Sequence, residues 1–88
     1  MPKYDITFAQ SARKELERLS DSIVSHIFPK IEALAQDPRP PGCRKLQGFE
    51  NLWRIRAGDY RVIYQVFDDE LVVDITAVRH RSQAYKLQ

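Results

Sequence analysis

Residues 52–78 read LWRIRAGDYRVIYQVFDDELVVDITAV. β-Branched and aromatic residues fill three runs of this stretch, 52–57, 60–67 and 71–78, and such runs are typical of β-strands. The pairs Gly58-Asp59 and Asp68-Asp69 separate the runs, and short turns of this composition join antiparallel neighbours. We therefore expect two consecutive hairpins that form an antiparallel sheet.

The turn positions also predict which residues share a face, because directly opposed residues lie on the same side of a sheet. The first turn places Arg56 opposite Arg61, and the second places Arg61 opposite Thr76 and Tyr64 opposite Val73. One face is then apolar apart from its phenol oxygens and collects Trp53, Ile55, Ala57, Tyr60, Val62, Tyr64, Val66, Leu71, Val73, Ile75 and Ala77. The other face collects Arg54, Arg56, Arg61, Ile63, Gln65, Val72, Asp74, Thr76 and Val78. We expect helices on the apolar face and solvent on the other.

The N-terminal segment predicts a further strand and a first helix. Every second residue from Tyr4 to Phe8 is apolar, which is the period of a half-buried strand. Thr7 and Gln10 have the spacing of a capping box, so the helix is expected to begin there and to continue to about Leu19. Its apolar stripe consists of Phe8, Ala12, Leu16 and Leu19.

A second helix is expected directly after the first. Ser20 or Asp21 can cap it, and helical spacing then relates the apolar residues Ile23, Ile27, Ile31 and Leu34. Pro29 lies inside this pattern and predicts a kink rather than an end, because the apolar phase continues through it. The proline-rich segment 37–42 cannot continue a helix and is expected to link the helix hairpin to the sheet.

These elements predict an α+β fold with the order β-α-α-β-β-β. The helix hairpin packs on one face of a small, mainly antiparallel sheet. At 88 residues the chain has the size of a single domain, which we expect to span residues 1–88. Residues 82–88 are too few for a stable isolated helix and are expected to form a frayed turn.

Charge is unevenly distributed along the chain, although the formal net charge is only +2. Residues 42–66 carry five basic and two acidic residues, residues 67–78 carry four acidic and no basic residues, and residues 79–88 carry three basic and no acidic residues. Segregation of this kind favours a polyanionic partner, although solvated surface charge would give the same counts. Cys43 is the only cysteine, and the first residues contain no apolar run, so we expect a cytoplasmic protein without a membrane partner.

The arginines of the open face favour a phosphate site. Opposed like charges such as Arg56 and Arg61 destabilise a sheet by roughly 0.2 to 1 kcal/mol. Guanidinium groups offer planar donor forks that match phosphate oxygens, and Arg79 and Arg81 follow at the end of the last strand. The competing interpretation is ordinary exposed arginine, with Arg54 paired to Asp74 in the same cross-strand row.

The motifs of the chain are KLQG at 45–48, WRIR at 53–56, GDYRVIYQV at 58–66 and VRHRSQAY at 78–85. In this order they resemble the RelE branch of the RelE/ParE toxin superfamily, and the likeness covers nearly the whole chain. Its most specific part is the hairpin with YRVIY, followed one strand later by a basic cluster and Tyr85. The resemblance implies a RelE-like fold and the toxin of a type II toxin-antitoxin system.

The resemblance further implies a ribosome-dependent mRNA endonuclease that inhibits translation. In this family the ribose 2′-hydroxyl attacks the adjacent phosphate, and neither a metal nor another cofactor is needed. The residues that match the family's catalytic positions are Arg54, Arg56, Arg61, Arg79 and Tyr85. The implied partners are the ribosome, mRNA and a cognate antitoxin, whose acidic and partly disordered segment is expected to wrap the toxin.

Individual roles follow from chemistry. Arg61 and Arg79 suit stabilisation of the charge that develops on the phosphorane and on the leaving oxygen. Tyr85 can stack on a base and donate a proton, or it can simply pack. His80 is an acid or base candidate because imidazole titrates near neutral pH, or else one more member of a basic patch.

Other basic and titratable residues are assigned to binding or to structure. Arg44, Lys45 and Arg81 are expected to contact the backbone of RNA, which positions a protein without reading sequence. His26 is expected to be structural, because its helical neighbours are apolar.

Three alternatives remain at this point. A ParE-like toxin has the same fold and acts by binding DNA gyrase without catalytic residues of its own. A non-catalytic RNA-binding relative is favoured by Arg54 and Arg56, where the best-known members carry lysine, because arginine cannot act as a general base. A metal-dependent nuclease is disfavoured, since the acidic residues 68–70 sit together in a turn.

Overall fold

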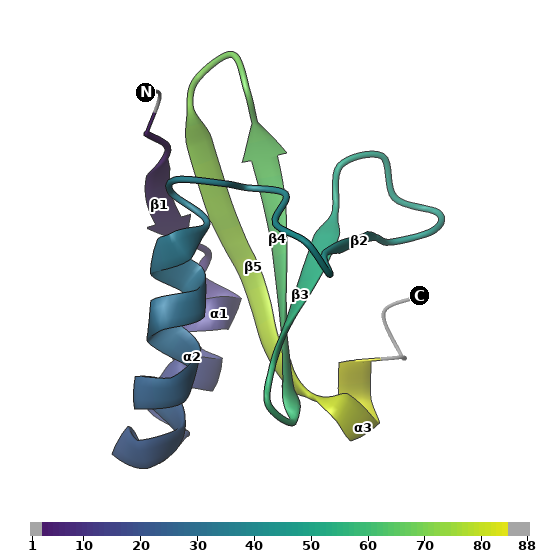
Figure 1. Ribbon diagram of the computed structural model, residues 1–88. Helices are drawn as coiled ribbons and strands as arrows, with labels where there is room; N and C mark the ends of the chain where they lie inside the picture. Colours follow the sequence, from purple (N-terminus) through teal and green to yellow (C-terminus); the bar gives the residue numbers. More distant parts are fainter. Residues whose placement is uncertain (1–2, 85–88) are drawn as a thin grey trace.

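The computed structural model describes residues 3–84, in which helices pack against a five-stranded, mostly antiparallel sheet. The elements in chain order are β1 (Asp5–Phe8), α1 (Gln10–Glu17), α2 (Asp21–Ala33), β2 (Arg44–Lys45), β3 (Trp53–Ala57), β4 (Tyr60–Phe67), β5 (Val72–His80) and α3 (Arg81–Ala84). The strands lie in the order β1-β5-β4-β3-β2, with β1 parallel to β5 and the other pairs antiparallel. Figure 1 shows α1 and α2 together on one side of the sheet and α3 beyond the other side.

The predicted α+β fold and its helix hairpin are confirmed, and two short elements were not predicted. β2 extends the sheet at the edge of β3, where Arg44 pairs with Arg54 and Lys45 with Trp53. α3 replaces the first residues of the expected frayed turn. The expected turn's last residues, 85–88, lie outside the described part of the chain.

The first predicted hairpin is confirmed residue by residue. Gly58 and Asp59 form the turn, Gly58 has a φ of 63°, and Arg56 lies opposite Arg61. A positive φ strains residues that carry a Cβ, so glycine is well suited to this position. The first hairpin therefore follows directly from its turn residues.

The predicted second hairpin is wrong in register. Phe67 pairs with Val72 instead of Glu70, so the loop covers residues 68–71, with Leu71 at a φ of 55°. A bulge between Ile63 and Tyr64 adds a further shift, which places Ile63 opposite Ala77. An inserted residue reverses the alternation of faces beyond it.

The bulge and the longer loop correct three face assignments. Ala77 lies on the open face beside Ile63 and Leu46, whereas Val78 packs in the core beneath the helices. Leu71 belongs to the loop and is exposed rather than packed under the helices. The strand pattern alone did not reveal these exchanges.

The sequence predicts the N-terminal cap of α2 correctly but not that of α1. Ser20 caps α2 as expected by accepting a hydrogen bond from the Ile23 N–H (3.3 Å), and α2 continues through Pro29. The capping box at Thr7 is wrong, because Thr7 stays in β1 and its hydroxyl donates to Asp74 (2.6 Å). α1 instead follows Ala9, which provides no side-chain cap.

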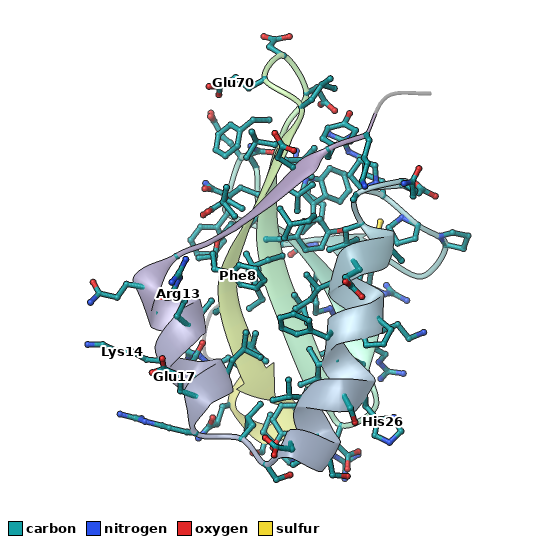
Figure 2. All side chains as sticks on the ribbon, turned by 90° about the vertical axis from the view of Figure 1, so that its left-hand side faces the viewer. Phe8, Arg13, Lys14, Glu17, His26 and Glu70 are labelled. Atoms are coloured by element: carbon teal, nitrogen blue, oxygen red, sulfur yellow. The ribbon has the colours of Figure 1, made fainter. Side chains whose placement is uncertain are left out.

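The main core lies between the helix hairpin and the sheet. Its most deeply buried side chains are Ile27, Ile31 and Leu34 from the helical segment and Val62, Tyr64, Val73 and Ile75 from the sheet. The buried Tyr64 hydroxyl donates to the carbonyl of Pro38 (2.7 Å), which fastens the proline-rich linker to β4. Figure 2, which views the helix side, shows Arg13, Lys14 and Glu17 on the outer surface of α1.

Two further observations concern the helices. His26 is exposed on α2, not enclosed by apolar neighbours, so the expected structural environment is wrong (Figure 2). Within residues 3–84, no helix is both long enough and apolar enough to cross a bilayer.

Candidate nucleic-acid interface

Three arginines form a continuous row across the open face of the sheet. Arg56 on β3 lies opposite Arg61 on β4, and Arg61 lies opposite Arg79 on β5. The sequence-based pairing of Arg61 with Thr76 is therefore wrong, because the longer loop and the bulge move Arg79 into that position. We call Arg56, Arg61 and Arg79 the arginine row. The sequence had placed Arg56 and Arg61 on the open face and Arg79 only at the end of the last strand. The observed register brings all three into one row.

Arg61 is the most buried member of the row and is only 3% exposed. Its Nη1 donates to the carbonyl oxygens of Tyr60 (3.2 Å) and Gly58 (3.4 Å), at the turn between β3 and β4. Its Nε is buried and has no hydrogen-bond partner within the described residues. α3 lies against β4 and β5 near this end of the sheet, so the expectation that Arg61 is open to solvent is wrong.

Arg79 lies at the β5 edge and reaches an acidic residue of α1. Its Nε contacts Oε2 of Glu15, and the two side chains are 30% and 23% exposed. The contact is an ion pair, and Nε of Arg79 has no hydrogen-bond partner within the described residues. Sequence reasoning missed Glu15, because neither its position in α1 nor its neighbours signal a contact with β5.

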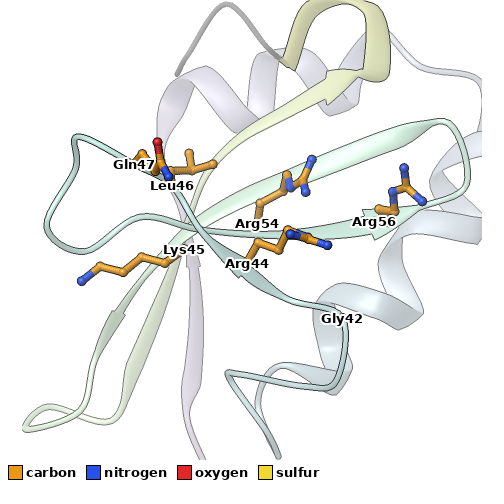
Figure 3. Close-up of a pocket in the computed structure, with 7 residues that line it drawn as sticks. All are labelled: Gly42, Arg44, Lys45, Leu46, Gln47, Arg54 and Arg56. Carbon is orange, nitrogen blue, oxygen red and sulfur yellow. The ribbon is translucent and has the colours of Figure 1, made fainter.

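A basic groove adjoins the row between β2 and β3. Its volume is about 610 Å³, and it is lined by Gly42, Arg44, Lys45, Leu46, Gln47, Arg54 and Arg56. Figure 3 shows Arg54 and Arg56 on the same side of β3, with Arg44 beside them on β2. Lys45 points away from this group, and its Nζ lies 6.0 Å from the centre of the Trp53 ring. Three of the expected RNA-contacting or catalytic arginines therefore line one groove.

Asp74 does not neutralise this surface. It lies opposite Gln65 and accepts the Thr7 hydroxyl, whereas Arg54 lies opposite Ile63. The prediction that Arg54 and Asp74 share one cross-strand row is therefore wrong.

The remaining candidates are placed away from the row or outside the described residues. His80 alternates to the helix side, where its ring meets Tyr60 edge-on at 5.4 Å and its Nδ1 accepts the Ser82 N–H (3.3 Å). The structure thus does not bring His80 together with the row. Arg81 is exposed at the start of α3, and its N–H donates to the carbonyl of Asp59 (2.7 Å). Tyr85 lies outside the described residues.

A second charged cluster, which the sequence did not predict, lies at the loop between β4 and β5. Arg39 donates to both carboxylate oxygens of Asp68 (2.8 and 3.2 Å), and Tyr4 donates to the same carboxylate (2.7 Å). These hydrogen bonds, chiefly the one from Arg39, lower the pKa of Asp68 below its ordinary value. Arg39 also lies over the Trp53 ring at 5.0 Å. In this cluster Arg39 meets both oxygens of a carboxylate, whereas in the arginine row only Arg79 has an ion pair among the described residues.

The geometry suits the recognition of a polyanion. Guanidinium groups on one face of a rigid sheet present several N–H donors at fixed positions, and a groove beside them can follow an extended backbone. Because strands hold their side chains more precisely than loops do, such a surface can also stabilise charge that develops during a reaction.

Comparisons with known proteins identify the family. A family model described as the ParE toxin of the type II toxin-antitoxin system parDE matches residues 6–85. A putative RelE-like toxin protein of Escherichia coli is 33% identical over 97% of this chain and 93% of the relative. The mRNA interferase toxin RelE of Escherichia coli K12 is 31% identical over 93% of this chain and 90% of the relative.

Solved structures agree with the sequence relatives. The archaeal RelE-RelB complex from Pyrococcus horikoshii OT3 contains a chain with a TM-score of 0.79 and 28% identity, covering 92% of this chain and 98% of that chain. The isolated Escherichia coli RelE toxin has a TM-score of 0.76 and 27% identity, covering 96% of this chain and 97% of that chain. With its whole-length match in sequence and in fold, this chain belongs to the RelE-type toxins of the RelE/ParE superfamily of type II toxin-antitoxin systems.

Proposed function

We propose that this toxin is an endoribonuclease that cleaves mRNA on the ribosome and thereby inhibits translation. The observation that carries the proposal is the arginine row, where like charges lie opposite each other across three strands. Such an arrangement destabilises the free protein and becomes favourable when an anion lies against it. The name mRNA interferase of the Escherichia coli relative supports the same activity.

In the proposed reaction, the ribose 2′-oxygen forms a bond to the adjacent phosphorus and the bond to the 5′-oxygen breaks. The 2′-hydroxyl loses its proton, the leaving 5′-oxygen gains one, and the products carry a 2′,3′-cyclic phosphate and a 5′-hydroxyl. Negative charge grows on the phosphorane and on the leaving oxygen. Arg56, Arg61 and Arg79 stabilise this charge, because preorganised cations bind it more strongly in the transition state than in the ground state.

The other predicted residues receive supporting roles in this proposal. Arg54 and Arg44 hold the RNA backbone in the groove, and Lys45 and Arg81 extend the basic surface toward ribosomal RNA. Tyr85 stacks on a base and donates a proton to the leaving oxygen. His80 is not assigned to proton transfer, since its ring is turned toward Tyr60 and Ser82.

The proposed natural inhibitor is a cognate antitoxin with an acidic segment. Structural relatives are described as complexes of RelE with RelB, which supports a partner of this type. An acidic segment that folds on binding would neutralise the arginine row and the groove and keep RNA away from both.

The proposal is tested by mapping cleavage with the purified protein on translating ribosomes and on the same mRNA free in solution. Cuts within the decoding site on ribosomes, with little cleavage of free RNA, are expected. Absence of cleavage in both samples would refute the proposal. A gyrase-inhibition assay would then test the ParE-like alternative, which the name of the matching family model favours.

A further inference from the structure

The outer edge of β5 has two kinds of partner. β1 pairs with β5 as far as Phe8 and Ile75, and the Ala9 N–H then donates to the Ile75 carbonyl (2.8 Å). Beyond this point, side chains of α1 bind the β5 backbone. The Ser11 hydroxyl donates to the Thr76 carbonyl (2.8 Å), and the Val78 N–H donates to Oε1 of Glu15 (2.8 Å).

Glu15 performs two tasks with one carboxylate. Oε1 accepts the backbone N–H of Val78, while Oε2 contacts Nε of the next residue, Arg79. Both side chains are less than one-third exposed, at 23% for Glu15 and 30% for Arg79, so solvent screens the contact only in part. Within residues 3–84, neither Arg56 nor Arg61 has an ion pair of this kind.

We infer that Glu15 is a positioning residue for Arg79, an inference that rests on the proposed function of the arginine row. A carboxylate at Nε engages one edge of the guanidinium and leaves the Nη fork as the part that meets a phosphate. The anchored Val78 backbone fixes the carboxylate itself, so α1 sets the direction of the arginine before RNA arrives. Preorganisation of this kind raises the rate of the chemical step more than the affinity for the substrate.

The hydrogen bond from Val78 also gives Glu15 a structural role. The substitution Glu15→Gln separates this structural role from the positioning of Arg79. The glutamine amide oxygen can still accept the Val78 N–H, but the side chain carries no charge to hold Arg79. Glu17→Gln is the matched control, because it makes the same charge change on the same helix at an exposed position.

The first measurement is the single-turnover cleavage rate on programmed ribosomes at increasing ribosome concentration, together with the melting temperature. For Glu15→Gln we expect a rate at saturation about 10-fold lower, an unchanged half-saturating concentration and an unchanged melting temperature. Glu17→Gln should have the same saturated rate, half-saturating concentration and melting temperature as the wild type. If the wild type cleaves and Glu15→Gln cleaves equally fast, the inference is overturned while the proposed function stands.

The second measurement, NMR relaxation of arginine Nε–Hε groups, needs no activity. The Arg79 signal, assigned by its loss in Arg79→Lys, should be more ordered in the wild type than that of exposed Arg18. It should become mobile in Glu15→Gln. Equal order in the two proteins overturns the inference even if no RNA is cleaved. Should Glu15→Gln fail to fold, a wild-type Arg79 as mobile as Arg18 overturns it as well.

Discussion

The two faces of the sheet are built from the same strands but differ in the polarity of their side chains. On the helix-covered face, Val62, Tyr64, Val73 and Ile75 are each 0% exposed and lie against α1 and α2. On the open face, the cross-strand row of β3, β4 and β5 consists of three arginines. Apolar burial stabilises the first arrangement, whereas opposed like charges weaken the second. The difference supports our proposal that the arginine row of the open face serves to bind an anionic ligand.

Arg39 is an example of an arginine with a structural role, and its environment differs from that of Arg61. Its guanidinium meets both oxygens of Asp68 and lies over Trp53. Arg61, in contrast, donates only to backbone carbonyls and keeps a buried Nε without a partner among the described residues. An arginine that is held in place but incompletely satisfied is suited to receive a further acceptor.

Of all the changes considered, loss of Arg79 should reduce toxicity the most. If it does not, the functional difference between the two faces of the sheet is refuted. Arg79→Ala is expected to abolish growth inhibition, because removal of one preorganised donor lowers a rate about 100-fold or more. Arg18→Ala, which removes an exposed arginine from the end of α1, should remain fully toxic. Growth curves after induction, with protein levels measured in parallel, provide the test. Wild-type toxicity of Arg79→Ala would mean that the row is not the site.

A change on the helix-covered face should instead affect stability. Ile75→Ala is expected to lower the free energy of unfolding by about 2 to 5 kcal/mol, because it leaves a cavity among fully buried neighbours. Urea denaturation measures this loss. Cleavage per folded molecule should stay near that of the wild type, and a loss of cleavage in fully folded Ile75→Ala would show that the two faces are not separable.

Tyr64 sharpens the comparison, because it is a polar residue within the apolar face. Tyr64→Phe leaves the Pro38 carbonyl without its donor and is expected to lower the free energy of unfolding by about 1 to 3 kcal/mol. Burial raises the pKa of Tyr64 well above its usual range. The folded protein therefore retains this proton more tightly than the unfolded chain, and the stabilisation is lost as pH rises above about 10. Unfolding curves between neutral and alkaline pH should converge for the wild type and Tyr64→Phe, and parallel curves would refute the assignment.

The smallest effect is expected at Asp68, whose ion pair with Arg39 is exposed. Because the folded-state pKa of Asp68 is lowered, chiefly by Arg39, its contribution to stability is present at neutral pH and is lost as pH falls below about 4. Asp68→Asn should therefore melt slightly earlier than the wild type at neutral pH and at the same temperature in acid. Molar salt should also narrow the gap. A difference that persists in acid would point to a cause other than charge.

The sequence predicted those parts of the fold that depend on local signals. The Gly58-Asp59 turn sets the register of the first hairpin, and Ser20 and the apolar stripe set α2. The open-face positions of Arg54, Arg56 and Arg61 followed from that register. The exposure of Arg61 did not, because it depends on elements that meet only in the folded chain.

The parts that were missed depend on contacts between distant residues. The loop after Phe67 is held by Arg39, which lies 29 residues before Asp68, so no local pattern distinguishes it from a two-residue turn. The bulge leaves Thr76 of β5 unpaired between the pairs Ile63–Ala77 and Tyr64–Ile75, and no local pattern marks this residue. Together with the longer loop, it places Arg79 opposite Arg61. Glu15 lies 63 residues before Val78, and only the three-dimensional packing of α1 on the β5 edge reveals it.

The most direct test of the central claim is the cleavage rate of Arg61→Lys at saturating ribosome concentration. Lysine retains the charge but lacks the donor fork that fits a phosphate. If the arginine row stabilises the transition state, the saturated rate falls about 10-fold or more while ribosome affinity changes little. A loss that disappears at high ribosome concentration would contradict the account and would make the row a binding surface only.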